Sequence, residues 1–164
     1  MEYTVSMENV TITTPAGNMP HVFINPVATV KPNLNIMRAW MGQNSSATSA
    51  QLSMAHRLQA TAFPSGGTST TPSPLKPAGP ASNITGGTAG AAGTSGVNYT
   101  TLGAGTKTLI IPDTFNNLNG YLWVATPKEL ITLGAGSTTG YGIYLISTPS
   151  ALTGWSSGII YSED

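Results

Sequence analysis

Apolar residues recur at every second position in short runs, and Gly, Pro, Asn, Ser and Thr separate one run from the next. Such alternation is typical of β-strands that bury one of their two faces. In the first run Tyr3, Val5 and Met7 share a face, and the alternation resumes at Val10 after a one-residue slip, which predicts a β-bulge at residues 8–9. The runs predict eight or nine strands, at residues 3–12, 21–30 with a break at 25–26, 34–43, 51–63, 106–112, 120–127, 128–133, 141–146 and 158–163.

One run suits both a strand and a helix. Leu52, Met54, His56 and Leu58 alternate as in a strand, although the residue types around them are also good helix formers. The period of two continues through residues 60–63, so we interpret the run as a strand. The chain then has no convincing helix. This pattern predicts an all-β antiparallel β-sandwich of the jelly-roll type, formed by a single domain that spans residues 1–164.

A long segment rich in Gly, Thr and Pro interrupts the strand pattern at residues 64–105. Its composition alone predicts a disordered linker. However, disordered segments usually carry charge, and Lys76 is the only charged residue here. We therefore expect a long neutral insertion loop within the domain that is ordered and lies against another protein surface.

Charged residues make up 7% of the chain, where an ordinary soluble domain has about 25%. No acidic residue occurs between Glu8 and Asp113, although most enzyme chemistry at neutral pH uses a carboxylate as base, nucleophile or metal ligand. Cysteine is absent, which removes thiolate nucleophiles and Cys-based zinc sites. We therefore expect a protein that is not an enzyme and that binds no cofactor or metal.

The net charge and the apolar runs exclude further classes of partner. The net charge is zero and the few cations are scattered, whereas nucleic-acid binding needs a basic surface. The apolar runs are far shorter than the roughly 20 residues of a membrane helix, and the N-terminus shows no signal-peptide pattern. We expect a soluble, cytoplasmically made product without nucleic-acid or membrane partners. Because zero net charge favours association, we also expect it to form oligomers.

Few residues are candidates for chemistry. His56 lies on an alternating apolar face and His21 begins a predicted strand, so both are interpreted as hydrogen-bonded histidines of a core or an interface. Asp113 is expected to start or cap a turn and Glu129 to be solvated, although the two could converge in space. The glycines at residues 86–90 lack the Gly-Lys-Ser/Thr of a phosphate-binding loop.

The tryptophans allow a second interpretation. Trp40, Trp123 and Trp155, with several tyrosines, could form an exposed platform for sugars, although such residues more often fill a core or an interface. A carbohydrate-binding module is therefore the alternative from a different functional class, and loss of glycan binding on Trp155→Ala or Trp40→Ala would favour it.

An ordered series of motifs resembles a group of small tailed-bacteriophage virion proteins. The match covers about residues 37–160 and runs from Arg38-Ala39-Trp40-Met41-Gly42-Gln43 through residues 51–58 to residues 126–136. Its most specific part is Gly66-Gly67-Thr68-Ser69-Thr70-Thr71-Pro72-Ser73-Pro74-Leu75. The resemblance implies a structural particle component with a β-sandwich fold and no catalytic residues. A head decoration (cement) protein of this kind, a trimer on the outside of the capsid, would bind the major capsid protein and itself in the virion.

The long loop is the expected grip on neighbouring subunits, because a neutral Gly/Thr/Pro surface can be buried without desolvating charges. The carbohydrate-binding alternative would then belong to a tail or fibre, and a further alternative is another minor virion component of the shell or neck. The expected partner-binding residues are Ser65, Gly66, Gly67, Thr68, Thr71, Pro72, Pro74, Leu75 and Pro77.

Overall fold

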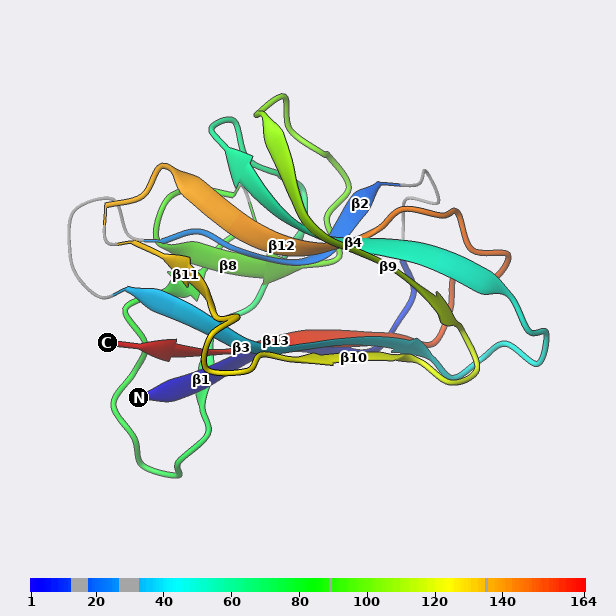
Figure 1. Cartoon of the computed structure of the whole chain (residues 1–164), viewed down its shortest axis with the longest axis horizontal. Helices are drawn as coiled ribbons and strands as arrows, with labels where there is room; N and C mark the ends of the chain where they lie inside the picture. Colours follow the sequence, from blue (N-terminus) through cyan, green and yellow to red (C-terminus); the bar gives the residue numbers. More distant parts are fainter. Residues whose placement is uncertain (13–17, 27–32, 89, 135) are drawn as a thin grey trace.

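Strands with one apolar face must bury that face, and in this protein two β-sheets bury theirs against each other (Figure 1). The computed structural model describes residues 1–12, 18–26, 33–88, 90–134 and 136–164. These residues form strands, turns and loops and contain no helix. The all-β sandwich predicted from the alternation is confirmed.

Each sheet has its own set of strands. Across sheet A the order is β10 (Tyr121–Val124), β3 (Leu34–Gln43), β13 (Trp155–Glu163), β1 (Glu2–Val10) and β6 (Ser73–Pro74), with β11 (Ile131–Leu133) also paired to β3. Across sheet B the order is β5 (Thr68–Ser69), β8 (Thr94–Val97), β2 (Met19–Ile24), β12 (Thr139–Leu145), β4 (Gln51–Ala60) and β9 (Lys107–Asn116), with β7 (Thr85–Gly86) paired to β8. Apart from the β7–β8 pair, the pairing is antiparallel.

Eight of these strands give the sandwich its topology. Taken in chain order they are β1, β2, β3, β4, β9, β10, β12 and β13. The first pairs with the last, the second with the seventh, the third with the sixth and the fourth with the fifth. These pairs divide between the two sheets, as in a jelly roll, which is the type expected from the sequence.

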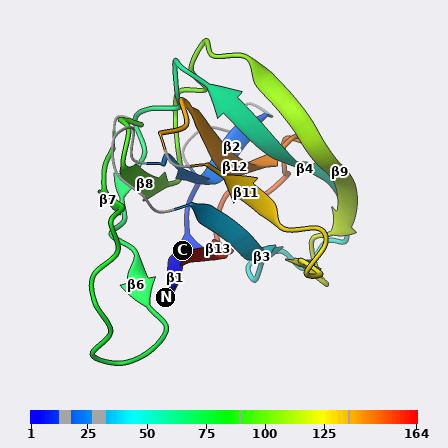
Figure 2. The same cartoon turned by 60° about the vertical axis from the view of Figure 1, so that its left-hand side comes forward.

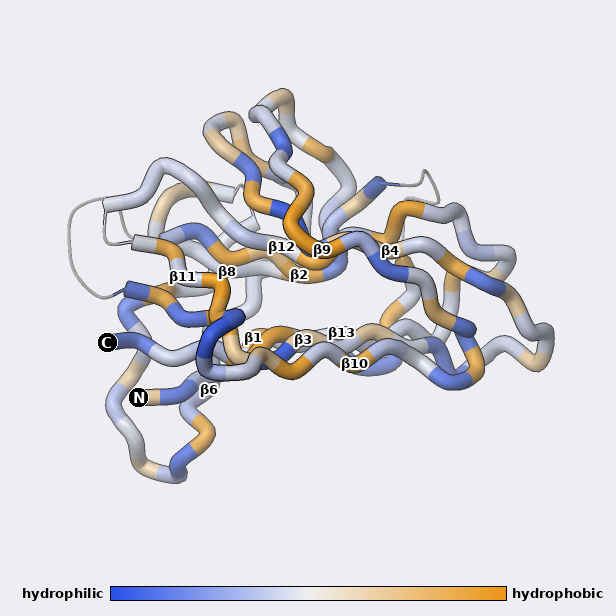
Figure 3. Tube along the Cα trace, in the orientation of Figure 1, coloured by the Kyte–Doolittle hydropathy of each residue, from blue (hydrophilic) through white to orange (hydrophobic). Residues whose placement is uncertain are grey.

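The main core lies between the sheets, where the alternating apolar positions meet (Figure 3). Val5, Ile36, Ile143 and Ile159 are completely buried. The bulge predicted at residues 8–9 is confirmed, because the register of β1 against β13 shifts there.

The segment at residues 64–105 is less loop-like than its composition predicts. It contains the four short strands β5 to β8, and β8 joins sheet B beside β2. Its stretch at residues 82–97, which we call the closing segment, contributes Ile84 and Val97 to the main core. Glu163 at the end of β13 anchors the start of this stretch by accepting hydrogen bonds from Ser82 and Asn83. The closing segment thereby links the end of β13 in sheet A to sheet B (Figure 2).

The segment at residues 64–105 also covers part of the outer face of sheet B. Phe23 of β2 and Tyr144 of β12 point away from the main core, yet both are completely buried. Tyr99 and Phe63 pack on Phe23, with ring centroids 6.2 and 6.0 Å apart. Gly142 makes room for this cluster, because a Cβ there would lie 2.6 Å from the Phe23 ring. One surface that the charge-poor segment contacts is therefore its own domain.

Several strand bounds differ from the sequence-based expectations; for example, the strand predicted at residues 120–127 is limited to residues 121–124. β4 ends at Ala60 rather than continuing to residue 63. β9 extends to Asn116, so Asp113 lies within a strand, opposite Met54, and the expected turn at this position is wrong. Pro112 is compatible with this because β9 is an edge strand, where a missing N–H is tolerated. The strand predicted at residues 27–30 lies outside the described residues.

Candidate functional site

The outer face of sheet A, hereafter the outer face, is where the described residues gather exposed apolar side chains. Alternation along each strand sends every second side chain to this face. The register places Val124 of β10, Arg38 of β3, Ile160 of β13 and Thr4 of β1 in one row across the sheet. The next row contains Leu122 of β10, Trp40 of β3 and Gly158 of β13.

In that second row Leu122 lies beside Trp40, and Trp40 lies opposite Gly158. A methyl group at position 158 would overlap the Trp40 indole, so the glycine lets this ring lie flat on the sheet. The indole is partly exposed. The row therefore presents a leucine and a tryptophan side by side to solvent.

Seven large apolar side chains are exposed among the described residues, and five of them belong to the outer face or its rim. The largest exposures are those of Leu122, at 64%, and Val124, at 50%. Single exposed apolar residues are normal, but a cluster on one face marks an interaction surface. The five are Met1, Leu75, Leu122, Val124 and Leu130.

A groove crosses the outer face between two loops. It consists of two adjoining hollows of about 480 Å³ each, which share Glu2 and Met37 as lining residues. One hollow lies between Leu75 and the loop after β10, and Leu130 and Pro127 line its far side. Methionines make such surfaces adaptable because their side chains are unbranched and polarizable. The remaining lining residues of the two hollows are Met1, Arg38, Lys76, Val124, Ala125, Ile160, Ser162 and Asp164.

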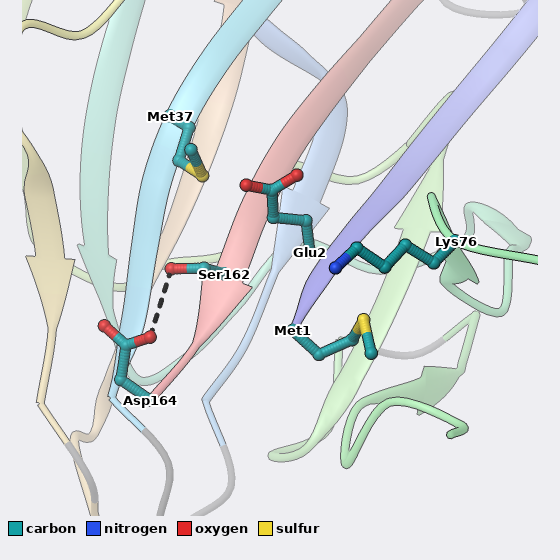
Figure 4. Close-up of a pocket in the computed structure, with 6 residues that line it drawn as sticks. All are labelled: Met1, Glu2, Met37, Lys76, Ser162 and Asp164. Atoms are coloured by element: carbon teal, nitrogen blue, oxygen red, sulfur yellow. Dashed lines mark hydrogen bonds between the residues drawn. The ribbon is translucent and has the colours of Figure 1, made fainter. Parts of the chain in front are cut away.

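Charges of both signs line the groove. Figure 4 shows the second hollow, where Glu2, Lys76 and Asp164 surround Met37 and Met1, and the Ser162 hydroxyl bonds the Asp164 carboxylate. Arg38 adds a second cation in the neighbouring hollow. The groove thus combines an apolar surface with two acids and two bases, a combination suited to protein contacts and not to a polyanion.

The nine expected partner-binding residues do not lie on one surface: some pack against their own domain, and others are exposed. Ser65 to Thr68 lie against their own domain, since Ser65 exchanges backbone hydrogen bonds with Thr101 and Gly67 packs on the Tyr99 ring. Pro72 is buried, whereas Thr71 and Pro77 are exposed. Pro74 belongs to β6, and Leu75, which is 42% exposed, reaches the outer face.

Leu122, Val124, Leu130 and Met37 were not among the residues expected from the sequence. The signal for Leu122 and Val124 is present, because residues 121–124 are apolar on both faces of the strand. Recognising it as a surface requires the knowledge that the outer face of sheet A is uncovered at Leu122 and Val124.

His56 is a buried, hydrogen-bonded histidine, as expected. Its Nδ1 lies 2.6 Å from the Tyr141 hydroxyl and its Nε2 lies 2.9 Å from that of Tyr121. Burial lowers the pKa of His56 to about 4, although the nearby Asp113 carboxylate acts in the opposite direction. Burial, together with Asp113, raises the pKa of the Tyr121 hydroxyl to about 12. The neutral His56 imidazole lies between two protonated phenols, and these hydrogen bonds stabilise the interior. This structural role accounts for the histidine without a substrate.

His21 also conforms to the expectation. Its ring is buried, with Nδ1 3.3 Å from the Ser157 hydroxyl and the ring edge-on to Trp155. Burial lowers the pKa of His21 to about 3. Glu129 is exposed, as expected, in the turn before β11, where it accepts a hydrogen bond from Thr126.

The tryptophans do not gather into one exposed platform. Trp155 is completely buried and its indole N–H donates to the Ala151 carbonyl. Trp123 points inward against His56, with ring centroids 5.0 Å apart. Trp40 alone of the three lies on the outer face, which removes Trp155 from the residues that could stack on a sugar.

Two kinds of feature are absent from the described residues. These residues contain no group of three or more His, Asp or Glu side chains placed to hold a metal ion. They also contain no helix of the length and apolarity that a membrane crossing requires. Comparison with protein-family models, curated proteins and solved structures finds no significant match to this chain.

Proposed function

We propose that this protein is a non-enzymatic structural component of a tailed-bacteriophage particle, a decoration protein that docks its outer face on the outside of the head shell. The observation that carries the proposal is the gathering of five of the seven exposed large apolar side chains on this one face of a charge-poor jelly roll. The sequence motifs at residues 37–160 support the choice of particle, because they resemble those of small phage virion proteins.

The chemistry of the outer face fits a protein partner. Its apolar side chains gain free energy on burial, roughly 1.5–3 kcal/mol for each leucine that becomes fully buried. The acids and bases that line the groove can pair with charges of the opposite sign on such a partner. A symmetric shell offers many equivalent sites, so modest contacts repeated on neighbouring subunits add up to stable decoration. Leu75 lies at the outer face and belongs to the segment at residues 64–105, which the sequence predicts to contact neighbouring subunits.

The test is binding of the purified chain to heads of the encoding phage that were assembled without it. The wild-type chain should sediment with the heads at a fixed number of copies per shell. The double variant Leu75→Ser with Leu130→Ser should bind at least about tenfold more weakly, because two apolar contacts are lost. Leu109→Ser is the matched control, since Leu109 is 52% exposed but belongs to β9 of sheet B.

Two results would overturn the proposal. One is a wild-type chain that does not sediment with the heads at any concentration. The other is equal weakening by the control and the double variant, which would mean that the outer face is not the docking surface. A reconstruction of the decorated particle would then locate the chain directly.

A further inference from the structure

The edges of the two sheets are protected to different degrees. Proteins protect edge strands with prolines, bulges, charged residues or shortness, because unpaired N–H and C=O groups invite another strand. β9, at the edge of sheet B, carries Lys107, Pro112 and Asp113 and has an irregular register. β6, at one edge of sheet A, has two residues, of which one is Pro74. β10, at the other edge, is four residues long, has the sequence Tyr-Leu-Trp-Val and contains no proline, bulge or charged residue.

The free side of β10 presents the main-chain groups of two residues. In antiparallel pairs, residues alternate between those bonded to the neighbouring strand and those facing away. The N–H of Ala125 donates to the Met37 carbonyl of β3 at 2.9 Å, so the bonds toward β3 come from the odd-numbered residues. The N–H and C=O groups of Leu122 and Val124 therefore face away from β3, and no strand of the described residues lies on that side.

We propose that β10 pairs with β10 of a second copy of this chain, antiparallel, about a two-fold axis at Trp123. This register places Leu122 of one copy opposite Val124 of the other, and the reverse. These are the residues whose main-chain groups face outward, so the pair gains about four main-chain hydrogen bonds. The two copies of sheet A become one continuous sheet, and their outer faces lie side by side.

The chemistry of the strand favours a second copy as the occupant. Apolar and β-branched side chains then meet across the axis on the outer face, and Trp123 meets its counterpart on the inner face, both stabilising cross-strand pairs. No charged residue lies between Asp113 and Lys128, so the strand itself brings no charge into the contact. A strand that complements itself in this way produces an isologous contact, the commonest kind in oligomers.

The size of the contact sets its strength. Stable interfaces bury about 800 Å² on each partner, more than a strand of this length covers by itself. The association is therefore concentration-dependent, and it gives an even-numbered oligomer in place of the trimer that the sequence resemblance implies. It concerns the chain alone and does not depend on what the outer face binds.

The test combines sedimentation velocity with amide hydrogen exchange on the purified chain, without phage heads. The wild type should shift from monomer to dimer with increasing concentration. The Leu122 and Val124 amides should become protected over the same range, whereas the Trp123 and Ala125 amides, bonded to β3, should be protected throughout. Val124→Pro should remain monomeric with an unchanged melting temperature, because the N–H it removes has no partner within the chain.

Val124→Thr is the matched control, because it keeps the N–H and the branched side chain and should still dimerise. A wild type that is monomeric at every concentration, or that forms a trimer, would overturn the pairing. So would a dimer that Val124→Pro leaves intact, or a dimer without protection of the Leu122 amide. A dimer that fails to bind heads would support the pairing and refute the proposed function, and a head-binding monomer would do the opposite.

Discussion

Lowering the pH from 7 to 5 should destabilise this fold, because two histidines are buried as neutral rings. Burial lowers the pKa of His56 to about 4 and that of His21 to about 3, from an ordinary value of 6.5. In the unfolded chain both rings are exposed and take up a proton near pH 6.5. Between these values the unfolded state binds protons that the folded state excludes, so stability falls as the pH falls.

The size of the effect follows from the pKa shifts. One pKa unit corresponds to 1.36 kcal/mol, and pH 5 lies about 1.5 units below the unfolded pKa, so each histidine costs about 2 kcal/mol at that pH. The two together cost about 4 kcal/mol, a large part of the 5–15 kcal/mol that stabilises a typical domain. The loss begins near pH 6.5 and levels off near pH 4 for His56 and near pH 3 for His21.

Urea denaturation at pH 7 and pH 5 measures this loss. Tryptophan fluorescence is a suitable probe, because Trp123 and Trp155 contact His56 and His21. The chain has only six acidic residues, so few carboxylates titrate in the same range. His56→Gln, which places a neutral polar group there, should lose only about 2 kcal/mol between the two pH values. A wild-type loss below about 1 kcal/mol, or an unchanged loss in His56→Gln, would refute the reasoning.

Two further predictions concern the hydrogen bonds of Tyr144 and Glu163. Tyr144→Phe should lower the free energy of unfolding by about 1–2 kcal/mol, because it removes the 2.6 Å bond that the hydroxyl donates to buried Gln59. Tyr99→Phe should be neutral or stabilising, since the buried Tyr99 hydroxyl has no partner in the described part of the chain, and equal losses in urea denaturation would contradict this difference. Glu163→Gln should weaken the anchor of the closing segment by about 1 kcal/mol and speed hydrogen exchange there, because it replaces a charged acceptor by a neutral one. Glu8→Gln, at an exposed position of β1, should change neither quantity, and slow exchange in both variants would argue against the anchor.

The elements that alternation defines were predictable from the sequence. β3 begins at Leu34 and ends at Gln43 as predicted, because buried positions alternate on the side that meets the core, apart from a one-residue slip between Ile36 and Ala39. The slip in β1 was readable for the same reason, since the bulge at Asn9 restores the inward face for later residues. The jelly-roll topology followed from the number of strands and the absence of helices.

β8 was not predictable from its composition. Gly96 has unfavourable strand propensity and Ser95 no marked preference for strands, and Thr94 does not stand out in a segment where threonine is common throughout. They form a strand because β2 supplies the ladder, with Phe23 opposite Gly96. Such pairing between distant parts of the chain is tertiary information, which local propensity does not contain.

The candidate site could not be predicted from the sequence for a related reason. A run that is apolar on both faces, such as residues 121–124, predicts a strand buried on both sides. β10 instead buries one face only, because nothing in the described residues covers Leu122, and it also lies at an edge, where β3 is its only partner strand. Leu75 was predicted as a partner-binding residue, but its closeness to Val124 and Leu130 depends on the fold.

The scarcity of charge was interpreted as a sign of contact with other proteins, and the structure divides this signal between two causes. In the segment at residues 64–105 much of the neutral surface covers the domain's own core, since Ile84, Val97 and Tyr99 are buried within it. Deleting that segment to test a grip on neighbours would therefore expose the core and unfold the domain, whatever the segment binds. The neutral residues that remain exposed, above all Leu75 on this segment, are the ones whose substitution tests binding without removing the fold.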